Sequence, residues 1–163
     1  MTPIATQILD LVGSRLANIK IENGYFNTLI KLERARLQPF KNQDMPSINY
    51  YSTGDSLVKP LNTSVSERTV EVMVEFYTTT RDRVFTDLAN ELSTDVMIAI
   101  ERDPVSPNVS DTLSPRLGFK VMRVEVPSIT PVIGEGQKPY AGCVLNISIT
   151  YRVDKNDPFV MLD

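Results

Sequence analysis

Apolar side chains recur along this chain with two different periods, and each period predicts one type of element. A spacing of three or four residues near the start is typical of an amphipathic helix and predicts a helix over residues 3–19. The same spacing predicts a second helix over residues 81–102, which Asp103-Pro104 should end because proline cannot continue a helix. The apolar positions are Ile4, Ile8, Leu11, Val12, Leu16 and Ile19 in the first helix, and Phe85, Leu88, Ala89, Leu92, Val96, Ala99 and Ile100 in the second.

Gly13 stands inside the first predicted helix. A glycine there costs about 1 kcal/mol relative to alanine, because the backbone of glycine has more freedom to lose on folding. A close approach of the helix to a neighbouring strand at this position would offset that cost.

A period of two residues predicts the strands. It is clearest at 69–77, where Val70, Val72, Val74 and Phe76 alternate with Thr69, Glu71, Met73, Glu75 and Tyr77. One face of this strand should be buried and the other largely polar. Residues 141–153 alternate in the same way, and weaker patterns predict strands at 25–37, 46–51 and 117–126. Proline, glycine and hydroxyl side chains predict an extended hairpin loop at 52–64 and a connecting loop at 127–139.

The resulting order of elements, α-β-β-β-α-β-β, predicts an α+β fold. We expect one domain over residues 1–163, with a mainly antiparallel sheet of about five strands and both helices packed on one face. The second face of the sheet would remain partly open. Residues 154–163 would form a C-terminal arm.

The open face and the end of the chain are the candidate subunit interface. On the predicted strand at 69–77 the outward residues are Glu71, Met73, Glu75 and Tyr77, and the apolar residues near the end of the chain are Phe159, Val160, Met161 and Leu162. The C-terminal group either packs on its own sheet or extends to the sheet or groove of a neighbouring subunit. Three long polar loops, at 38–47, 52–66 and 103–116, either order against neighbouring subunits or remain exposed.

Catalytic chemistry has few candidates in this sequence. The chain contains no histidine, which removes the most common general base and most zinc sites. Gly134-Glu135-Gly136 lacks the strand and helix that would flank a phosphate-binding loop. Residues 154–157 carry oxygen ligands but lack the glycine and closing glutamate of a calcium loop, so a solvated turn is expected. We therefore expect no enzyme activity, no cofactor and no metal.

Charge, cysteine content and the absence of long apolar runs limit the classes of partner that we expect. The chain carries 17 basic and 20 acidic residues, a net charge of −3, and has no basic run, so specific nucleic-acid binding is not expected. The single cysteine, Cys143, lies in an apolar alternating stretch and is interpreted as a buried small hydrophobe. No signal peptide and no apolar run of 18 residues is present, so we expect a cytoplasmic start and no membrane partner.

Three short segments carry a family resemblance: Arg15-Leu16-Ala17-Asn18-Ile19, Asn23-Gly24-Tyr25, and Met45-Pro46-Ser47-Ile48 at the start of a strand. Together with the strand–helix–strand–strand second half, they resemble the tail terminator proteins of long-tailed bacteriophages. The resemblance implies a small α/β protein that forms a hexameric ring on the last ring of tail tube protein, stops tail polymerisation and faces the neck. The implied partners are further copies of itself, tail tube protein and a neck or head-completion protein, with sheath protein as a further candidate. The implied location is the tail–neck junction of the virion, after assembly in the host cytoplasm.

Three alternatives remain open. A neck or head-completion protein also forms a ring between capsid and tail. A small-molecule-binding or regulatory domain would instead contain a closed apolar pocket and exist as a monomer or dimer. An enzyme that uses carboxylates alone would require Glu71 or Glu75 to face a cleft with a raised pKa.

Overall fold

The computed structural model describes residues 2–80, 83–101, 121–134 and 140–162. In chain order the elements are α1 (Ile4–Leu16), the 3-10 helix η1 (Ile21–Asn23), β1 (Lys31–Arg34), the 3-10 helix η2 (Asn42–Asp44), β2 (Ser47–Pro60), β3 (Val65–Thr79), α2 (Phe85–Glu101), β4 (Val121–Ile133), β5 (Tyr140–Asp154) and β6 (Asp157–Leu162). The fold class is α+β, as the sequence predicts.

The strands form one sheet in the order β1-β2-β3-β5-β4, with β6 also paired to β5. Among the described strands, only β1 and β2 are parallel, and every other pair is antiparallel. Along one edge of β5, β4 pairs as far as Tyr151 and β6 takes over at Arg152. The predicted order lacks β6, because the short apolar C-terminal segment shows no clear alternation of its own.

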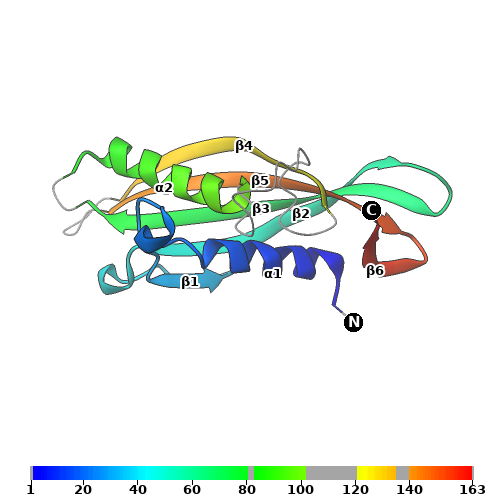
Figure 1. The fold of residues 1–163 in the computed structure, drawn as a ribbon, viewed down its shortest axis with the longest axis horizontal. Helices are drawn as coiled ribbons and strands as arrows, with labels where there is room; N and C mark the ends of the chain where they lie inside the picture. Colours follow the sequence, from blue (N-terminus) through cyan, green and yellow to red (C-terminus); the bar gives the residue numbers. More distant parts are fainter. Residues whose placement is uncertain (1, 81–82, 102–120, 135–139, 163) are drawn as a thin grey trace.

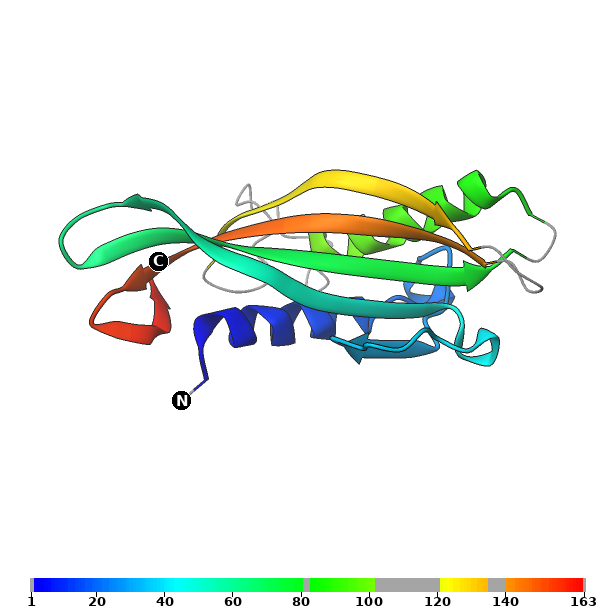
Figure 2. The ribbon, with the colours of Figure 1, turned by 180° about the vertical axis from the view of Figure 1, so that it is seen from behind.

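Both helices pack on the same face of the sheet, as predicted. Figure 1 shows α1 and α2 in front of the strands, and the reverse view in Figure 2 shows the strands in front of α2. The alternating apolar residues of β3 lie directly opposite those of β5, in the pairs Val70–Ile149, Val72–Ile147, Val74–Leu145 and Phe76–Cys143. With helix residues that include Ile8, Val12, Leu16, Leu92, Val96 and Ile100, they form one buried core. Cys143 is buried, as predicted.

Gly13 confirms the predicted close approach of helix and strand. A Cβ atom added to Gly13 would overlap the hydroxyl of Tyr50 on β2 and lie 2.9 Å from its Cζ atom. Tyr50 is only 7% exposed and belongs to the core. The absence of a side chain at Gly13 therefore permits α1 to lie against the sheet.

The strand predicted at 25–37 is wrong outside β1. The backbone amides of Phe26 and Asn27 donate to the carboxylate of Asp95 on α2, at 2.8 and 2.9 Å, instead of joining a ladder. Asn27 Nδ2 donates to the same carboxylate at 2.9 Å. Asp95 is fully buried. This contact fixes the segment before β1 against the second helix.

The loop predicted at 52–64 is also wrong, because β2 and β3 form one long hairpin. Their pairing continues to Pro60 opposite Ser66, with register shifts at Ser52/Gly54 and Leu57/Lys59. Only residues 61–64 form the turn. Figures 1 and 2 show that this hairpin extends well past the helices at one end of the molecule. Its residues do not alternate because residues 52–60 of β2 are all exposed.

The connection predicted at 127–139 is wrong for its first half, where β4 continues to Ile133. Among the strands that the structure describes, β4 has a partner on one side only. An outer strand of this kind tolerates Pro127 and Pro131, whereas a central strand would lose ladder hydrogen bonds at each proline. The second helix begins at Phe85, four residues later than predicted, and residues 81–82 and 102 lie outside the described residues. The loop expected at 103–116, the strand start at 117–120 and residues 135–139 also lie outside them.

Candidate functional site

The predicted interface residues of β3 lie together on the face of the sheet that the helices leave uncovered. Glu71, Met73, Glu75 and Tyr77 are half-buried, whereas the residues between them are buried in the core. Across the sheet they lie opposite Ser148, Asn146, Val144 and Gly142 of β5. This face is a mixed surface of carboxylates, amides, hydroxyls and aromatic rings.

The two glutamates of this face have separate partners. The hydroxyl of Ser148 lies 2.8 and 2.7 Å from the two carboxylate oxygens of Glu71, and it donates to one of them at a time. Glu75 accepts hydrogen bonds from Tyr51 Oη at 3.1 Å and from Asn49 Nδ2 at 3.3 Å. Four residues along a strand span roughly 13 Å, more than the roughly 5–9.5 Å that separates paired catalytic carboxylates in glycosidases. The structure therefore does not bring Glu71 and Glu75 together as a pair.

A groove of about 820 Å³ lies at one end of this face, between β2, β3 and the segment 35–45. Its sheet side includes Tyr51, Glu75 and Tyr77, and its outer side includes Leu37 and Phe40. Leu37 is 99% exposed. The sequence pattern indicates the loop at 38–47 but gives no sign that it folds back over the sheet to form a groove.

Hydrogen bonds of Asn49 and Arg36 hold the segment 35–45 in place. Asn49 Oδ1 accepts the backbone amide of Arg36 at 2.8 Å, and Asn49 Nδ2 donates to the carbonyl of Arg36 at 3.1 Å. The Arg36 guanidinium donates to the carbonyl of Gln38 at 2.8 Å and lies 4.7 Å from the centre of the Phe40 ring. The segment leaves β1 at Ala35, which has a φ of 54°, a left-handed conformation that residues with a Cβ rarely adopt. The groove is thus a fixed feature of the fold.

Two tyrosines of the sheet, Tyr77 on β3 and Tyr140 on β5, line the groove. The rings of Tyr77 and Tyr140 meet edge to face, with centroids 5.5 Å apart and an angle of 87°. A Cβ on Gly142 would lie 2.5 Å from Tyr77 Cδ1, and a Cβ on Gly134 would overlap the ring of Tyr140. Each glycine therefore leaves room for one ring. Burial is the main cause that raises the pKa of Tyr77, and burial together with the hydrogen bond to Glu75 raises the pKa of Tyr51.

The predicted C-terminal residues lie at the other end of β5, away from the groove. Met161 is buried in the chain's own core at 2% exposure, whereas Val160 is 50% exposed. Gln7 Nε2 on α1 donates to the carbonyl of Phe159 at 2.9 Å. Leu162 pairs with Arg152. Of the two arrangements expected for this segment, the chain adopts the one in which it packs on its own sheet.

Other candidate chemistry is sparse in the part of the chain that the structure describes. Within it, no group of three or more histidine, cysteine, aspartate or glutamate side chains is placed to hold a metal ion. Asp154 Oδ1 accepts the backbone amide of Asn156 at 2.8 Å and so closes the turn between β5 and β6. Among the described residues, no helix has the length and apolar character needed to span a membrane.

Comparison with known proteins adds no family: no protein-family model matches this sequence, and a search of curated proteins gives no match.

Proposed function

We propose that this protein is a structural virion protein that assembles into a ring, caps the tail tube of a bacteriophage and ends its polymerisation. In this role the ring forms the tail side of the head–tail joint. Its partners are further copies of itself, tail tube protein and a neck or head-completion protein, with sheath protein as a further candidate. The family resemblance of the three sequence segments described above supports the assignment to the tail.

The uncovered face of the sheet is the observation that carries this proposal. It spans β2, β3, β5 and β4, and its central residues, such as Met73 and Tyr77, are only partly shielded from water. Apolar and aromatic side chains rimmed by polar groups are typical of protein–protein contact surfaces. A closed ring needs two different patches on each subunit, and an elongated sheet with a free face has room for both.

Light scattering over a range of concentrations tests the ring. The expected species is a hexamer of 18.3 kDa subunits, formed either in free solution or when purified tail tubes are added. The variant Met73→Asp, which places a charge on the uncovered face, should remain folded and fail to assemble. Asn90→Asp adds the same charge at an exposed position on α2 and should assemble normally. A wild-type chain that stays monomeric at every concentration and ignores tail tubes would contradict the proposal.

The groove supports a second candidate function, in which the protein binds a small molecule. Its volume of about 820 Å³ falls within the roughly 300–1,000 Å³ of ligand pockets. However, the groove is open to solvent along one side, whereas the small-molecule interpretation expects a closed apolar pocket. A library of aromatic and cationic compounds tested by thermal shift distinguishes the two functions. The small-molecule function would be favoured if a compound raises the melting temperature in a saturable way, Tyr77→Ala removes this effect, and the chain forms no ring.

A further inference from the structure

The tip of the β2–β3 hairpin presents apolar side chains to solvent. Leu57, Val58 and Leu61 are 53%, 47% and 38% exposed. The three lie within five residues of one another at the end of the hairpin that extends past the helices (Figure 1). We define Leu57, Val58 and Leu61 as the hairpin tip.

Local hydrogen bonds give the hairpin tip a fixed shape. Asn62 Oδ1 accepts the backbone amides of Ser64 and Val65 at 2.8 and 2.7 Å, and the amide of Leu61 donates to the carbonyl of Val65 at 2.9 Å. Docking such an ordered projection loses less conformational entropy than docking a loose loop.

The base of the hairpin is anchored to the body of the sheet. Asp55 on β2 accepts hydrogen bonds from Arg68 Nε at 2.7 Å and from the hydroxyl of Tyr151 on β5. Arg152 Nε on β5 lies 3.6 Å from a carboxylate oxygen of Glu67 on β3. These contacts hold the direction in which the hairpin projects.

The groove at the opposite end of the molecule is complementary to the hairpin tip. Leu37, Phe40 and Tyr77 provide apolar and aromatic walls, and the volume of about 820 Å³ has room for several apolar side chains. The Glu75 carboxylate in the groove has two neutral hydrogen-bond donors, and among the described residues no cation pairs with it. Arg36, the cation in the groove lining, is engaged with Glu33, whose carboxylate lies 3.4 Å from its guanidinium. Lys59 lies next to the hairpin tip in sequence and, like Glu75, has no ion pair within the described ranges. The two surfaces therefore match in apolar character and in charge.

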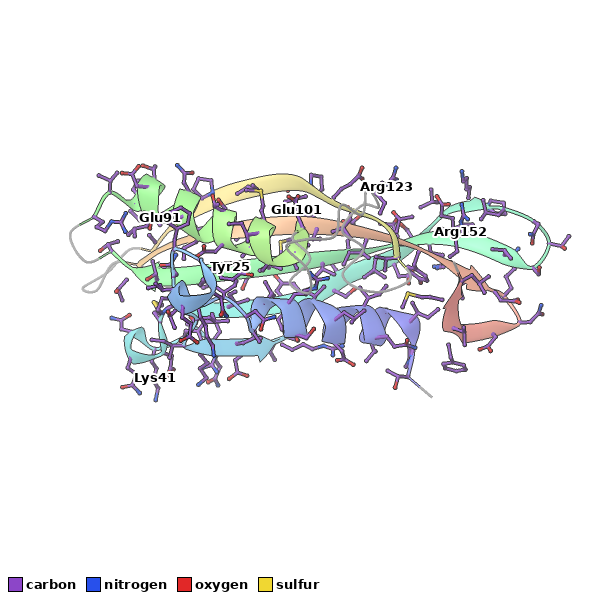
Figure 3. All side chains as sticks on the ribbon, viewed as in Figure 1. Tyr25, Lys41, Glu91, Glu101, Arg123 and Arg152 are labelled. Atoms are coloured by element: carbon purple, nitrogen blue, oxygen red, sulfur yellow. The ribbon has the colours of Figure 1, made fainter. Side chains whose placement is uncertain are left out.

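A chain cannot insert its hairpin tip into its own groove. Along β3, Ser64 at the turn and Tyr77 in the groove are 13 residues apart, which is roughly 40 Å of extended strand. In Figure 3, Lys41, on the segment that borders the groove, lies near one end of the molecule, and Arg152, near the base of the hairpin, lies toward the other. Only a second molecule can fill the groove with this tip.

We propose that the hairpin tip of one subunit inserts into the groove of the next. The contact joins two different patches, so its repetition gives a closed ring when the rotation between neighbouring subunits closes on itself, as the proposed ring requires. This inference rests on the proposed ring and adds a second contact between neighbouring subunits to the one that the uncovered face makes. Lys59 of one subunit would approach Glu75 of its neighbour.

A mixing experiment with two variants tests this arrangement. Leu57→Asp destroys the tip and keeps the groove, whereas Leu37→Asp alters the groove and keeps the tip. Each variant alone should be a folded monomer by light scattering and circular dichroism. An equimolar mixture should give a dimer of one copy of each, because one intact tip and one intact groove remain. Ile21→Asp, at a 63% exposed position on neither surface, should assemble like the wild-type chain.

Crosslinking detects the same contact when assembly is weak. Leu57→Cys and Leu37→Cys chains, mixed and treated with a flexible bismaleimide, should give a crosslinked dimer, and neither chain should do so with an Ile21→Cys chain. Cys143 does not interfere, because it is fully buried and burial raises the pKa of its thiol to about 12. A chain with cysteine at both 57 and 37 should give a series of crosslinked oligomers whose largest member has the mass of the complete ring.

The results separate this inference from the proposed function. The tip-in-groove contact would be overturned, and the ring retained, if three results occurred together: the wild-type chain forms rings, the Asp variants still assemble, and the 57–37 crosslink does not form. A 57–37 crosslink in chains that never close into a ring would support the contact and count against the capping function. Absence of both ring and crosslink would overturn both.

Discussion

Replacing Gly13 with alanine should destabilise the protein, although helix propensity alone predicts the opposite. In an exposed helix this change stabilises by about 1 kcal/mol. At Gly13 the new methyl group would overlap the hydroxyl of Tyr50 and lie 2.9 Å from its Cζ atom, where ordinary contacts are 3.4–4 Å. Tyr50 is 7% exposed and packed in the core, so its ring has little room to move.

The size of the effect follows from these two opposing contributions. Forcing an extra carbon into a packed core costs about 1–3 kcal/mol, and an overlap with both the hydroxyl and the ring falls toward the upper value. After subtraction of the propensity gain, we expect Gly13→Ala to lower the free energy of unfolding by about 1–2 kcal/mol. The loss should be smaller in a Tyr50→Phe background, since the phenylalanine lacks the hydroxyl and leaves only the ring contact.

Urea unfolding followed by circular dichroism measures this cycle in a chain that has no tryptophan. Ser14→Ala serves as the control, because Ser14 is exposed on the same helix and its replacement should be neutral or slightly stabilising. A Gly13→Ala protein that is more stable than wild type would refute the proposed contact. Equal losses from Gly13→Ala in the wild-type and Tyr50→Phe backgrounds would refute it as well.

Two further predictions concern the C-terminus and the buried carboxyl. Met161→Ala should lower the free energy of unfolding by about 2–3 kcal/mol in urea titrations, because the side chain is buried. Val160→Ala changes an exposed neighbour and should alter this free energy by less than about 0.5 kcal/mol. Equal losses from the two variants would place Met161 outside the core. Burial raises the pKa of Asp95 above its ordinary value of 3.8, so the folded state holds this proton more tightly than the unfolded chain. The stability of wild type relative to Asp95→Asn should therefore fall as pH rises from about 4 through the folded pKa, and a constant or rising difference across a pH series would refute this.

The sequence pattern predicts those parts of the fold in which one face of a strand or helix is buried. Residues 69–77 and 141–153 alternate because the helices cover one side of β3 and β5. The distal half of β2 extends past the helices, so both of its sides face water and the alternation disappears. Its strand structure depends on pairing with β3, which composition does not reveal.

Contacts between residues distant in sequence explain the other errors and the missed groove. Asp95 holds the amide of Phe26 from 69 positions away, so the local pattern at 25–30 gives no sign that these residues leave the sheet. Likewise, the side chain of Asn49 binds the backbone of Arg36, and this contact folds the segment 35–45 over the sheet. The open face itself was predictable, because the positions of Glu71, Met73, Glu75 and Tyr77 follow from alternation alone.

The two outer strands limit how these molecules can join. Unpaired backbone groups along an outer strand invite further strands to add, which is a common route to aggregation. Here β1 has only four residues and, among the described strands, covers β2 only at Ser47–Tyr50, so residues 51–60 of β2 keep a free outer edge. In β4, Pro127 and Pro131 have no amide hydrogen to offer an incoming strand. Backbone pairing with another molecule is thereby discouraged along β1 and β4, whereas the projecting part of β2 leaves an edge open to an incoming strand.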